Sequence, residues 1–334
     1  MGHVGTAVRA GAGALVGVAV EPRECHVWTL RDGKVWRLRI YATKSEALEA
    51  VGLSEQDALR IKVGGVQTAS SIREQIDALG PWCHELEVTD GISTREWHER
   101  NPGSDIAFLD PKSTKVSMML RRVYRRDLAG RSVLDCGCNA GGYLFLAREL
   151  GAGHCHGFDV RQHWIDQARF VAAARDEKEI TFEVCDLYDL RVEPFDVTLF
   201  NGLFYHLPDP IRGLKIAADL TREVMFVDTS TRAGVQDGYL AMETESTDIL
   251  VSGVYGLNWL PTGPVVVERI LEWAGFVEWR VIGYRNIRHD VNRLAMVASK
   301  VRGQLDGIPD FRTSMRDDAL EAVGLSKQDA HTDT

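Results

Sequence analysis

The stretch Ser132–Gly142 constrains the fold of this chain more than any other part of its sequence. It reads SVLDCGCNAGG, so a short apolar run ends in Asp135 and a glycine-rich turn leads into a helical pattern that opens at Tyr143. The order strand, tight turn, helix is typical of an α/β sheet. Glycines let a ligand approach the backbone, and the free N–H groups of the helix start point toward that ligand. We therefore expect a ligand-binding loop directly after Asp135.

The spacing in this loop separates two kinds of ligand. The dinucleotide fingerprint is G-x-G-x-x-G, whereas this loop reads Gly137-x-x-x-Gly141 with Asp135 two residues earlier. A carboxylate repels a phosphate and attracts a cation. The D-x-G-x-x-x-G spacing resembles motif I of the class I S-adenosylmethionine (SAM) dependent methyltransferases, although a glycine turn of an unrelated α/β sheet is an alternative. The resemblance implies that the methionine part of SAM contacts Asp135, Gly137, Cys138, Asn139 and Gly141.

Acidic and amide side chains recur at the ends of the next strands. Asp159 ends the run 154–160, about 20 residues past the loop, where a ribose-binding carboxylate is expected. Asp186 follows the run 180–184, and Asn201 ends the run 195–201. The methyltransferase resemblance implies ribose contacts at Asp159 and adenine contacts at Asp186, with the backbone N–H of Leu187 beside it. The predicted cofactor set is completed by Val160 and Asn201.

Alternation of strand and helix patterns predicts an α/β fold with a doubly wound, seven-stranded, Rossmann-like sheet. The expected strands are 132–136, 154–160, 180–185, 195–201, 224–228, 277–284 and 294–299. The expected helices between them are 142–150, 162–175, 209–220 and 264–274. No helix separates the last two strands, so the final strand is expected to be antiparallel. The methyltransferase domain thus covers 132–300, with an acceptor lid inserted at 229–262.

The segments that flank this domain have other patterns. Residues 1–59 alternate in the β manner around a hairpin turn at Arg31–Lys34, and Ala10–Val20 is read as a strand rather than a signal sequence. This segment resembles the C-terminal half of SnoaL-like (NTF2-like) domains without the helices that build their pocket, which favours a structural or interaction role.

Three further features lie outside the predicted sheet. Residues 60–131 are expected to form a helical lead-in and substrate-side cap, with helices at 71–79 and 116–128, and 301–334 a linker and C-terminal helix. The segments 46–58 and 318–330 repeat each other, without a functional account.

The amino-acid composition limits the partners that this protein is expected to bind. The net charge of −9 disfavours RNA, whose binding proteins usually carry a basic excess. Cys136-x-Cys138 lacks the spacing of a zinc or redox motif, so no metal site is expected. No apolar run is long enough for a transmembrane helix, and scattered cysteines fit a reduced compartment. We expect a cytoplasmic protein without a membrane partner.

Three further motifs resemble one branch of the class I methyltransferases, the tRNA wobble-uridine carboxymethyltransferase-like group. They are WCHELEVTDGIST, GLFYHLPDP and VYGLNWLPTGPVVVERILEWAGF, and the resemblance covers about residues 80–300. It implies that Tyr205 and His206 stand near the transferred group. Some members use carboxy-SAM. The sequence does not locate a basic residue for its extra carboxylate, so SAM is the expected cofactor.

These observations predict a SAM-dependent methyltransferase that methylates an oxygen of a small metabolite. His206 is the candidate base, because its ordinary pKa lies near working pH, and a structural histidine at a helix start is the alternative. Asp228 is a candidate for positioning the acceptor, while Tyr255 and Trp259 of the insertion are candidates for covering it.

Two other functions stay open. An RNA-modifying enzyme would need a basic surface around the pocket, built from Arg121, Arg122, Arg125, Arg126, Arg285, Arg288 and Arg293. A non-catalytic assembly module would show a blocked acceptor pocket and would lose a homo-oligomer when residues 1–59 are deleted.

Overall fold

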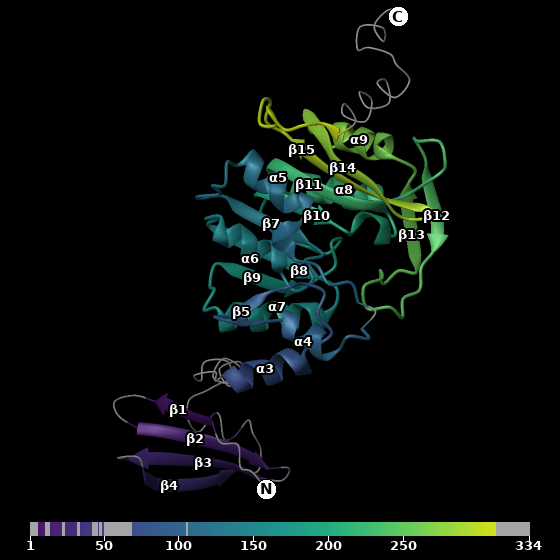
Figure 1. Ribbon diagram of the computed structural model, residues 1–334. Helices are drawn as coiled ribbons and strands as arrows, with labels where there is room; N and C mark the ends of the chain where they lie inside the picture. The colour runs from purple at the N-terminus through teal and green to yellow at the C-terminus, as the bar shows by residue number, and fades with distance from the viewer. Residues whose placement is uncertain are drawn as a thin grey trace, which may run out of the picture. The chain divides into compact units, whose positions relative to one another are not determined.

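The computed structural model divides the chain into two compact units, Met1–Gln75 and Ile76–Thr334, each with its own sheet (Figure 1). The sequence had suggested a boundary at residue 59. The structure describes β1 (Thr6–Ala10), β2 (Ala14–Glu21), β3 (Glu24–Arg31), β4 (Lys34–Tyr41), residues Glu46 and Glu49, and residues 69–104 and 106–311.

The first unit holds a four-stranded antiparallel sheet in the order β1-β2-β3-β4. β3 and β4 pair from Cys25↔Tyr41 to Arg31↔Lys34, which confirms the hairpin predicted around the Asp-Gly turn. β2 occupies most of the strand expected at Ala10–Val20. The repeat at 46–58 and 318–330 lies outside the described residues apart from Glu46 and Glu49, and the SnoaL-like resemblance stays a prediction.

The second unit is built on a seven-stranded sheet in the order β14-β15-β11-β10-β7-β8-β9. The strands from β7 to β11 pair in parallel, whereas β15 is antiparallel to both β11 and β14. This is the doubly wound α/β sheet that the sequence predicted, with the antiparallel last strand in place. Its strands are β7 (Ser132–Cys136), β8 (His154–Asp159), β9 (Ile180–Val184), β10 (Phe195–Asn201), β11 (Thr221–Arg232), β14 (Glu278–Arg288) and β15 (Val291–Ser299).

Helices pack on this sheet and bury its apolar side chains. Leu134 and Phe158 of the strands share one buried cluster with Leu214 of α8 and Leu271 of α9. The main helices are α3 (Ala69–Ala78), α5 (Lys115–Val123), α6 (Gly142–Glu149), α7 (Gln162–Ala174), α8 (Pro210–Asp219) and α9 (Pro264–Trp273). Shorter elements are β5 (Glu87–Thr89), β6 (Ile92–Ser93), α4 (Arg95–Arg100), η1 (Pro111–Ser113) and η2 (Phe204–His206). None of the described helices is long and apolar enough to cross a membrane.

The expected helix over 116–128 is too long at its C-terminal end. α5 ends at Val123, and Arg125 and Arg126 have positive φ angles of 52° and 66°. Residues in that region cannot continue a right-handed helix. Arg125 and Arg126 therefore lie in a turn and not on the helix that carries Arg121.

The predicted lid insertion begins later than expected. β11 continues to Arg232, and the insertion contains an antiparallel pair, β12 (Leu240–Thr244) and β13 (Leu257–Pro261), drawn green in Figure 1. The predicted linker after residue 300 starts with a packed segment, because Leu305 and Ile308 are buried.

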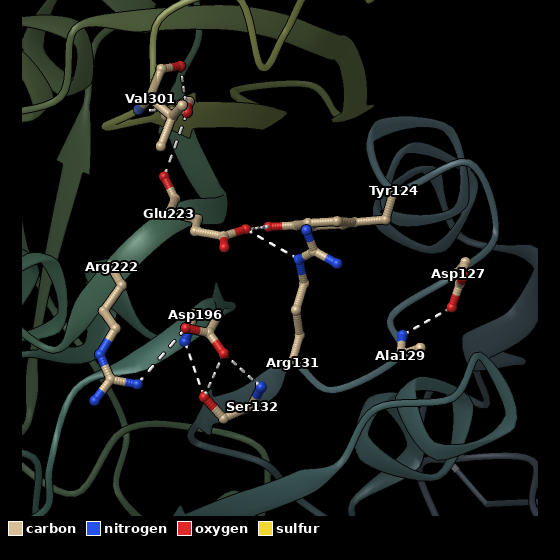
Figure 2. Close-up of polar contacts among 10 residues, drawn as sticks. Tyr124, Asp127, Ala129, Arg131, Ser132, Asp196, Arg222, Glu223 and Val301 are labelled. Atoms are coloured by element: carbon tan, nitrogen blue, oxygen red, sulfur yellow. Dashed lines mark hydrogen bonds and ion pairs between the residues drawn. The ribbon is translucent and has the colours of Figure 1, made fainter.

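Polar side chains hold the strands together at their amino ends (Figure 2). Asp196 Oδ2 accepts hydrogen bonds from the backbone N–H of Ser132 at 2.8 Å and from its hydroxyl at 2.9 Å. Glu223 Oε2 accepts from the Tyr124 hydroxyl at 3.2 Å and from Arg131 Nε at 3.1 Å. These contacts fix the starts of β7, β10 and β11, and so the positions of their carboxyl ends.

Candidate functional site

A cavity of about 900 Å³ lies at the carboxyl ends of the parallel strands. This is the edge where open α/β sheets bind ligands. With one exception, Gly141, every residue predicted to contact the cofactor or the transferred group lines it. Those residues are Asp135, Gly137, Cys138, Asn139, Asp159, Val160, Asp186, Leu187, Asn201, Tyr205 and His206.

The loop after β7 is tied to the end of β8. The N–H groups of Gly137 and Cys138 both donate to the Phe158 carbonyl, at 3.0 and 2.9 Å. The N–H of Asn139 donates to Asp159 Oδ2 at 3.1 Å. Gly137 and Asn139 have positive φ angles, 71° and 51°, which is why the chain can turn so tightly here.

Gly141 has a conformational role instead of a place in the cavity wall. Its φ is +76°, and it directly precedes α6. A Cβ at this position would lie 2.7 Å from ring carbons of Phe182. The glycine is therefore needed for the turn and for the close packing beneath it.

A buried and a half-buried carboxyl group, Asp135 and Asp159, form one side of the cavity. Asp135 is buried and its Oδ2 has no hydrogen-bond partner among the described residues. Burial raises the pKa of Asp135 to about 8, and the nearby Asp159 adds to the shift. Burial also raises the pKa of Asp159, although the N–H groups of Arg161 and Asn139 hydrogen-bond to its carboxylate. A cation bound here would relieve the cost of ionising both groups.

The insertion reaches the cavity through residues 250–255. The Tyr255 hydroxyl donates to Asp186 Oδ2, while Asp186 Oδ1 accepts from the Tyr188 N–H at 2.9 Å. Arg161 Nη2 donates to the carbonyls of Ile249 at 3.3 Å and Ser252 at 2.8 Å. The predicted adenine carboxylate is thus already engaged by the insertion. Trp259, in contrast, does not line the cavity.

His206 pairs with a carboxylate that the sequence did not single out. Its Nδ1 lies 2.8 Å from Glu245 Oε1 and also within 3.1 Å of the donating N–H of Gly253. The Glu245 side chain is only 7% exposed. Asn258, with its amide nitrogen turned toward the acceptors, donates to Glu245 Oε2 at 3.3 Å and to the Tyr205 carbonyl at 3.2 Å. The two contacts need opposite states of Nδ1: an unprotonated Nδ1 accepts from Gly253, whereas a protonated Nδ1 donates to Glu245. In the second state Nε2 is the basic nitrogen.

Tyr205 belongs to a second polar cluster. Its hydroxyl accepts from Arg293 Nη1 at 3.1 Å, and the same nitrogen donates to Ser230 Oγ at 3.2 Å. Arg293 Nε donates to Asp228 Oδ1. Asp228 lines the cavity as a partner of Arg293, so its role as an acceptor-positioning group requires sharing it with this guanidinium.

Sequence reasoning missed Glu245, Arg293 as the partner of Tyr205, and His84. His84 is buried beside the loop, where its Nδ1 accepts from the Gly142 N–H at 3.3 Å. Burial lowers the pKa of His84 to about 4, so this histidine is neutral near pH 7. No local sequence signal marks these residues, because each meets its partner across 39 positions or more in the chain.

The arginines that would build an RNA-binding rim are scattered. Only Arg285 and Arg293 of that set line the cavity. Arg121 donates to the Lys112 carbonyl at 3.0 Å, and Arg288 lies 3.8 Å from Asp290. Among the described residues, no cluster of three or more histidine, cysteine or acidic side chains is arranged to hold a metal ion.

Comparison with known proteins shows which proteins the second unit is similar to. Residues 127–249 match the family model described as "Methyltransferase domain". A ubiquinone biosynthesis O-methyltransferase of Neisseria meningitidis is 30% identical over 140 residues, covering 41% of this chain and 56% of the relative. A tRNA U34 carboxymethyltransferase of Campylobacter jejuni is 24% identical over 259 residues, covering 75% of this chain and 81% of the relative. The chain thus spans little more than half of the first of these relatives.

The fold has solved counterparts. The N-terminal domain of EvdMO1 with SAH bound superposes with a TM-score of 0.55 and 22% identity, covering 70% of this chain and 99% of that one. At this identity the likeness concerns the fold. Together with the strand order, it shows that the second unit has the same α/β fold as that SAH-bound domain.

Proposed function

We propose that this chain, which carries a class I SAM-dependent methyltransferase domain, binds SAM and methylates an oxygen of a small metabolite. The observation that carries the proposal is the buried carboxyl of Asp135, whose Oδ2 has no partner among the described residues at the wall of a large cavity. An ionisable group in this state fits a cationic ligand, and a sulfonium cofactor is such a ligand.

The residues that would hold the cofactor come from three neighbouring strand ends. Asp135 and the loop at Gly137 would face the methionine part, Asp159 the ribose and Asp186 the adenine. When bound, SAM supplies an electrophilic methyl group. The protein contributes mainly alignment of the acceptor with that group, which can lower a barrier by about 7–11 kcal/mol.

The His206–Glu245 pair supports an oxygen acceptor. A hydroxyl is a poor nucleophile until its proton is removed, and His206 Nε2 is suited to accept that proton. Glu245 would hold the imidazole in the required tautomer and stabilise it once protonated, as a buried carboxylate does in other base–carboxylate pairs. Tyr205, fixed by Arg293, would shape the wall beside the transferred group.

A second candidate function is tRNA modification with SAM or carboxy-SAM. The coverage of 75% of this chain by a tRNA U34 carboxymethyltransferase favours it. The scattered arginines and the net charge of −9 weigh against it. The non-catalytic alternative predicts a blocked acceptor pocket, and the cavity of about 900 Å³ argues against that.

We also infer a cytoplasmic location. The described thiols of Cys83, Cys136, Cys138, Cys155 and Cys185 are all free. Free buried cysteines are common in reducing compartments. The partner we expect is a small-molecule acceptor, and a homo-oligomer through residues 1–59 stays an open prediction.

Calorimetric titration of the full-length protein with SAM and S-adenosylhomocysteine tests the cofactor site. We expect micromolar binding of both, lost in Asp159→Ala. Asp166→Ala is the matched control, because Asp166 is an exposed acid on α7 outside the cavity wall and should leave the affinity unchanged. Absence of binding by either compound to folded protein would overturn the proposal.

A further inference from the structure

Charged side chains are unevenly distributed in the cavity wall: acidic groups predominate on one side of the sheet and basic groups on the other. Four carboxyl groups line it among the described residues, and three of them, Asp135, Asp159 and Asp186, lie at the carboxyl ends of β7, β8 and β9. The opposite side is formed by α5, β14 and β15, where only Asp228 of β11 provides a negative charge. Lys115, Arg285 and Arg293 line that side. Positive charge therefore exceeds negative charge where β14 and β15 border the cavity.

Arg285 and Arg293 are direct neighbours across two antiparallel strands. Like charges at such positions repel each other. Arg293 donates to Asp228 through Nε and to Tyr205 and Ser230 through Nη1. In the described part of the chain, the Arg285 guanidinium has no hydrogen bond or ion pair of its own. Asp228 is thus the carboxylate near both guanidiniums, and the N–H groups of Arg285 are still available to a ligand.

Lys115 is directed along the same strand by a glycine. A Cβ on Gly283 would lie 2.7 Å from Lys115 Cδ and 3.2 Å from its Nζ. The absence of that atom lets the lysine lie against β14, two residues before Arg285. Its ammonium stands 5.1 Å from the centre of the Phe311 ring, and no described carboxylate pairs with it. Two cations, neither of them in a described hydrogen bond or ion pair with a carboxylate, therefore lie along the same strand in the cavity wall.

Apolar side chains surround these cations. Met118 of α5 and Ile287 of β14 are each 48% exposed and line the cavity, as does Leu109 at 39% exposure. Large apolar side chains exposed in a concave site gain stabilisation when an apolar ligand covers them. This side of the cavity wall thus combines positively charged side chains with exposed apolar ones.

We propose that Arg285 and Lys115 bind an anionic group, a carboxylate or a phosphate, of an acceptor whose body is apolar. The inference rests on the proposed function, because it assigns this side of the cavity to the acceptor and the acidic side to SAM. Arg293 is assigned to the wall and not to the anion site, because its Nε and Nη1 already donate to Asp228, Tyr205 and Ser230. A planar guanidinium suits paired oxygens, and the ammonium adds a second point of charge.

The test uses small probes of the subsite. Benzoate and phenyl phosphate are the anionic probes, and benzyl alcohol is their neutral counterpart. Each is titrated calorimetrically into the full-length protein with and without S-adenosylhomocysteine. The variants are Arg285→Gln, Lys115→Gln and Gly283→Ala. Arg288→Gln is the matched control, because this arginine lies on the same strand but not in the cavity wall.

We expect at least one anionic probe to bind tenfold or more tightly than benzyl alcohol. The better of the two anions identifies carboxylate or phosphate as the group. Arg285→Gln and Lys115→Gln should reduce the preference to below threefold, Gly283→Ala should weaken it, and Arg288→Gln should leave it unchanged.

Equal affinity for anionic and neutral probes, or binding of neither, would overturn the proposal. Carboxy-SAM binding that depends on Arg285, without any preference for the anionic probes, would place the anion on the cofactor and also overturn it. Failure of S-adenosylhomocysteine to bind would refute the proposed function alone, since the probe titrations without it still report on Arg285 and Lys115.

Discussion

Asp135 is held in the structure as a buried carboxyl whose pKa burial raises from 3.8 to about 8. Between these values the folded state keeps a proton that the unfolded state releases, so this group makes folding less favourable as pH rises from 4 to 8. Asp135→Asn removes that dependence. We expect the variant to gain stability relative to the parent protein as pH rises, by at most about 1.4 kcal/mol per pH unit.

Denaturant unfolding of the ligand-free proteins at pH 5, 6.5 and 8 measures this difference. Asp166→Asn serves as the control, since it replaces an exposed carboxylate of α7. Its stability difference from the parent protein should change far less with pH. A difference for Asp135→Asn that stays constant across this range would mean that Asp135 is ionised in the folded protein.

Glu245 is the residue through which the proposed base can be tested. Glu245→Gln keeps the size of the side chain but removes the negative charge beside His206 Nδ1. General-base catalysis typically contributes 10²–10⁴-fold, so loss of its orienting partner should lower kcat by roughly 10–100-fold. The affinity for S-adenosylhomocysteine should change less than twofold, because Glu245 does not line the cavity.

Glu243→Gln is the control two residues earlier, on β12, since Glu243 pairs with Arg232 at 2.6 Å outside the cavity wall. Assays with the identified acceptor should give a kcat for this control within about twofold of the parent value. An unchanged kcat in Glu245→Gln would show that the pair only holds the insertion in place.

At the scale of single residues, the sequence best predicts the cavity-lining residues that lie at the ends of strands. Asp135, Asp159 and Asp186 could be located because each closes an apolar run of strand type. Glu245 and Arg293 could not, because their roles depend on partners brought together by the insertion and by the last strand. The periodicity of hydrophobic residues along the chain does not indicate which distant side chains contact each other.

Gly141 lies in the turn between β7 and α6, the strand-to-helix element from which the site is built. Gly141→Ala combines a positive φ with a Cβ 2.7 Å from Phe182, so we expect a loss of roughly 2–4 kcal/mol in the free energy of unfolding. Gly130→Ala is the control, because its φ is +74° and no atom lies within 4 Å of an added Cβ. It should cost only about 1–2 kcal/mol.

Urea unfolding at constant pH compares the two glycine variants. Equal losses would mean that the ring of Phe182 moves aside without cost, and that backbone conformation alone determines the choice of glycine. A larger loss in Gly141→Ala would mean that packing beneath the turn contributes as well.

Elements were predictable where a hydrophobic pattern and a turn signal agree. The hairpin of β3 and β4 and the strands β7 and β10 have such signals at both ends. The end of α5 was missed because Arg125 and Arg126 continue a polar helical pattern while their backbone leaves it. β11 exceeds its prediction because its last residues pair with β15, from Ser230↔Arg293 to Arg232↔Val291, and pairing of this kind is not encoded locally.

At the scale of the whole molecule, we expect the two units to have separable roles. Every described residue that lines the cavity is numbered 84 or higher. α3 contributes to the second unit, because Trp82 Nε1 donates to the Ile76 carbonyl at 2.8 Å, so a truncation must keep this helix. Deletion of residues 1–59 retains α3 and all cavity residues. We expect the shortened protein to bind S-adenosylhomocysteine with a dissociation constant within twofold of the full-length value.

Calorimetry and light scattering on the same samples distinguish the alternatives for the first unit. Fewer chains per particle than in the full-length protein, with unchanged binding, would assign the sheet of β1–β4 to self-association. An unchanged number of chains per particle and unchanged binding would exclude that role and leave the sheet free for another partner. Loss of binding by a folded, truncated protein would contradict the separation of roles, because it would require the first unit for a site whose described residues all lie in the second.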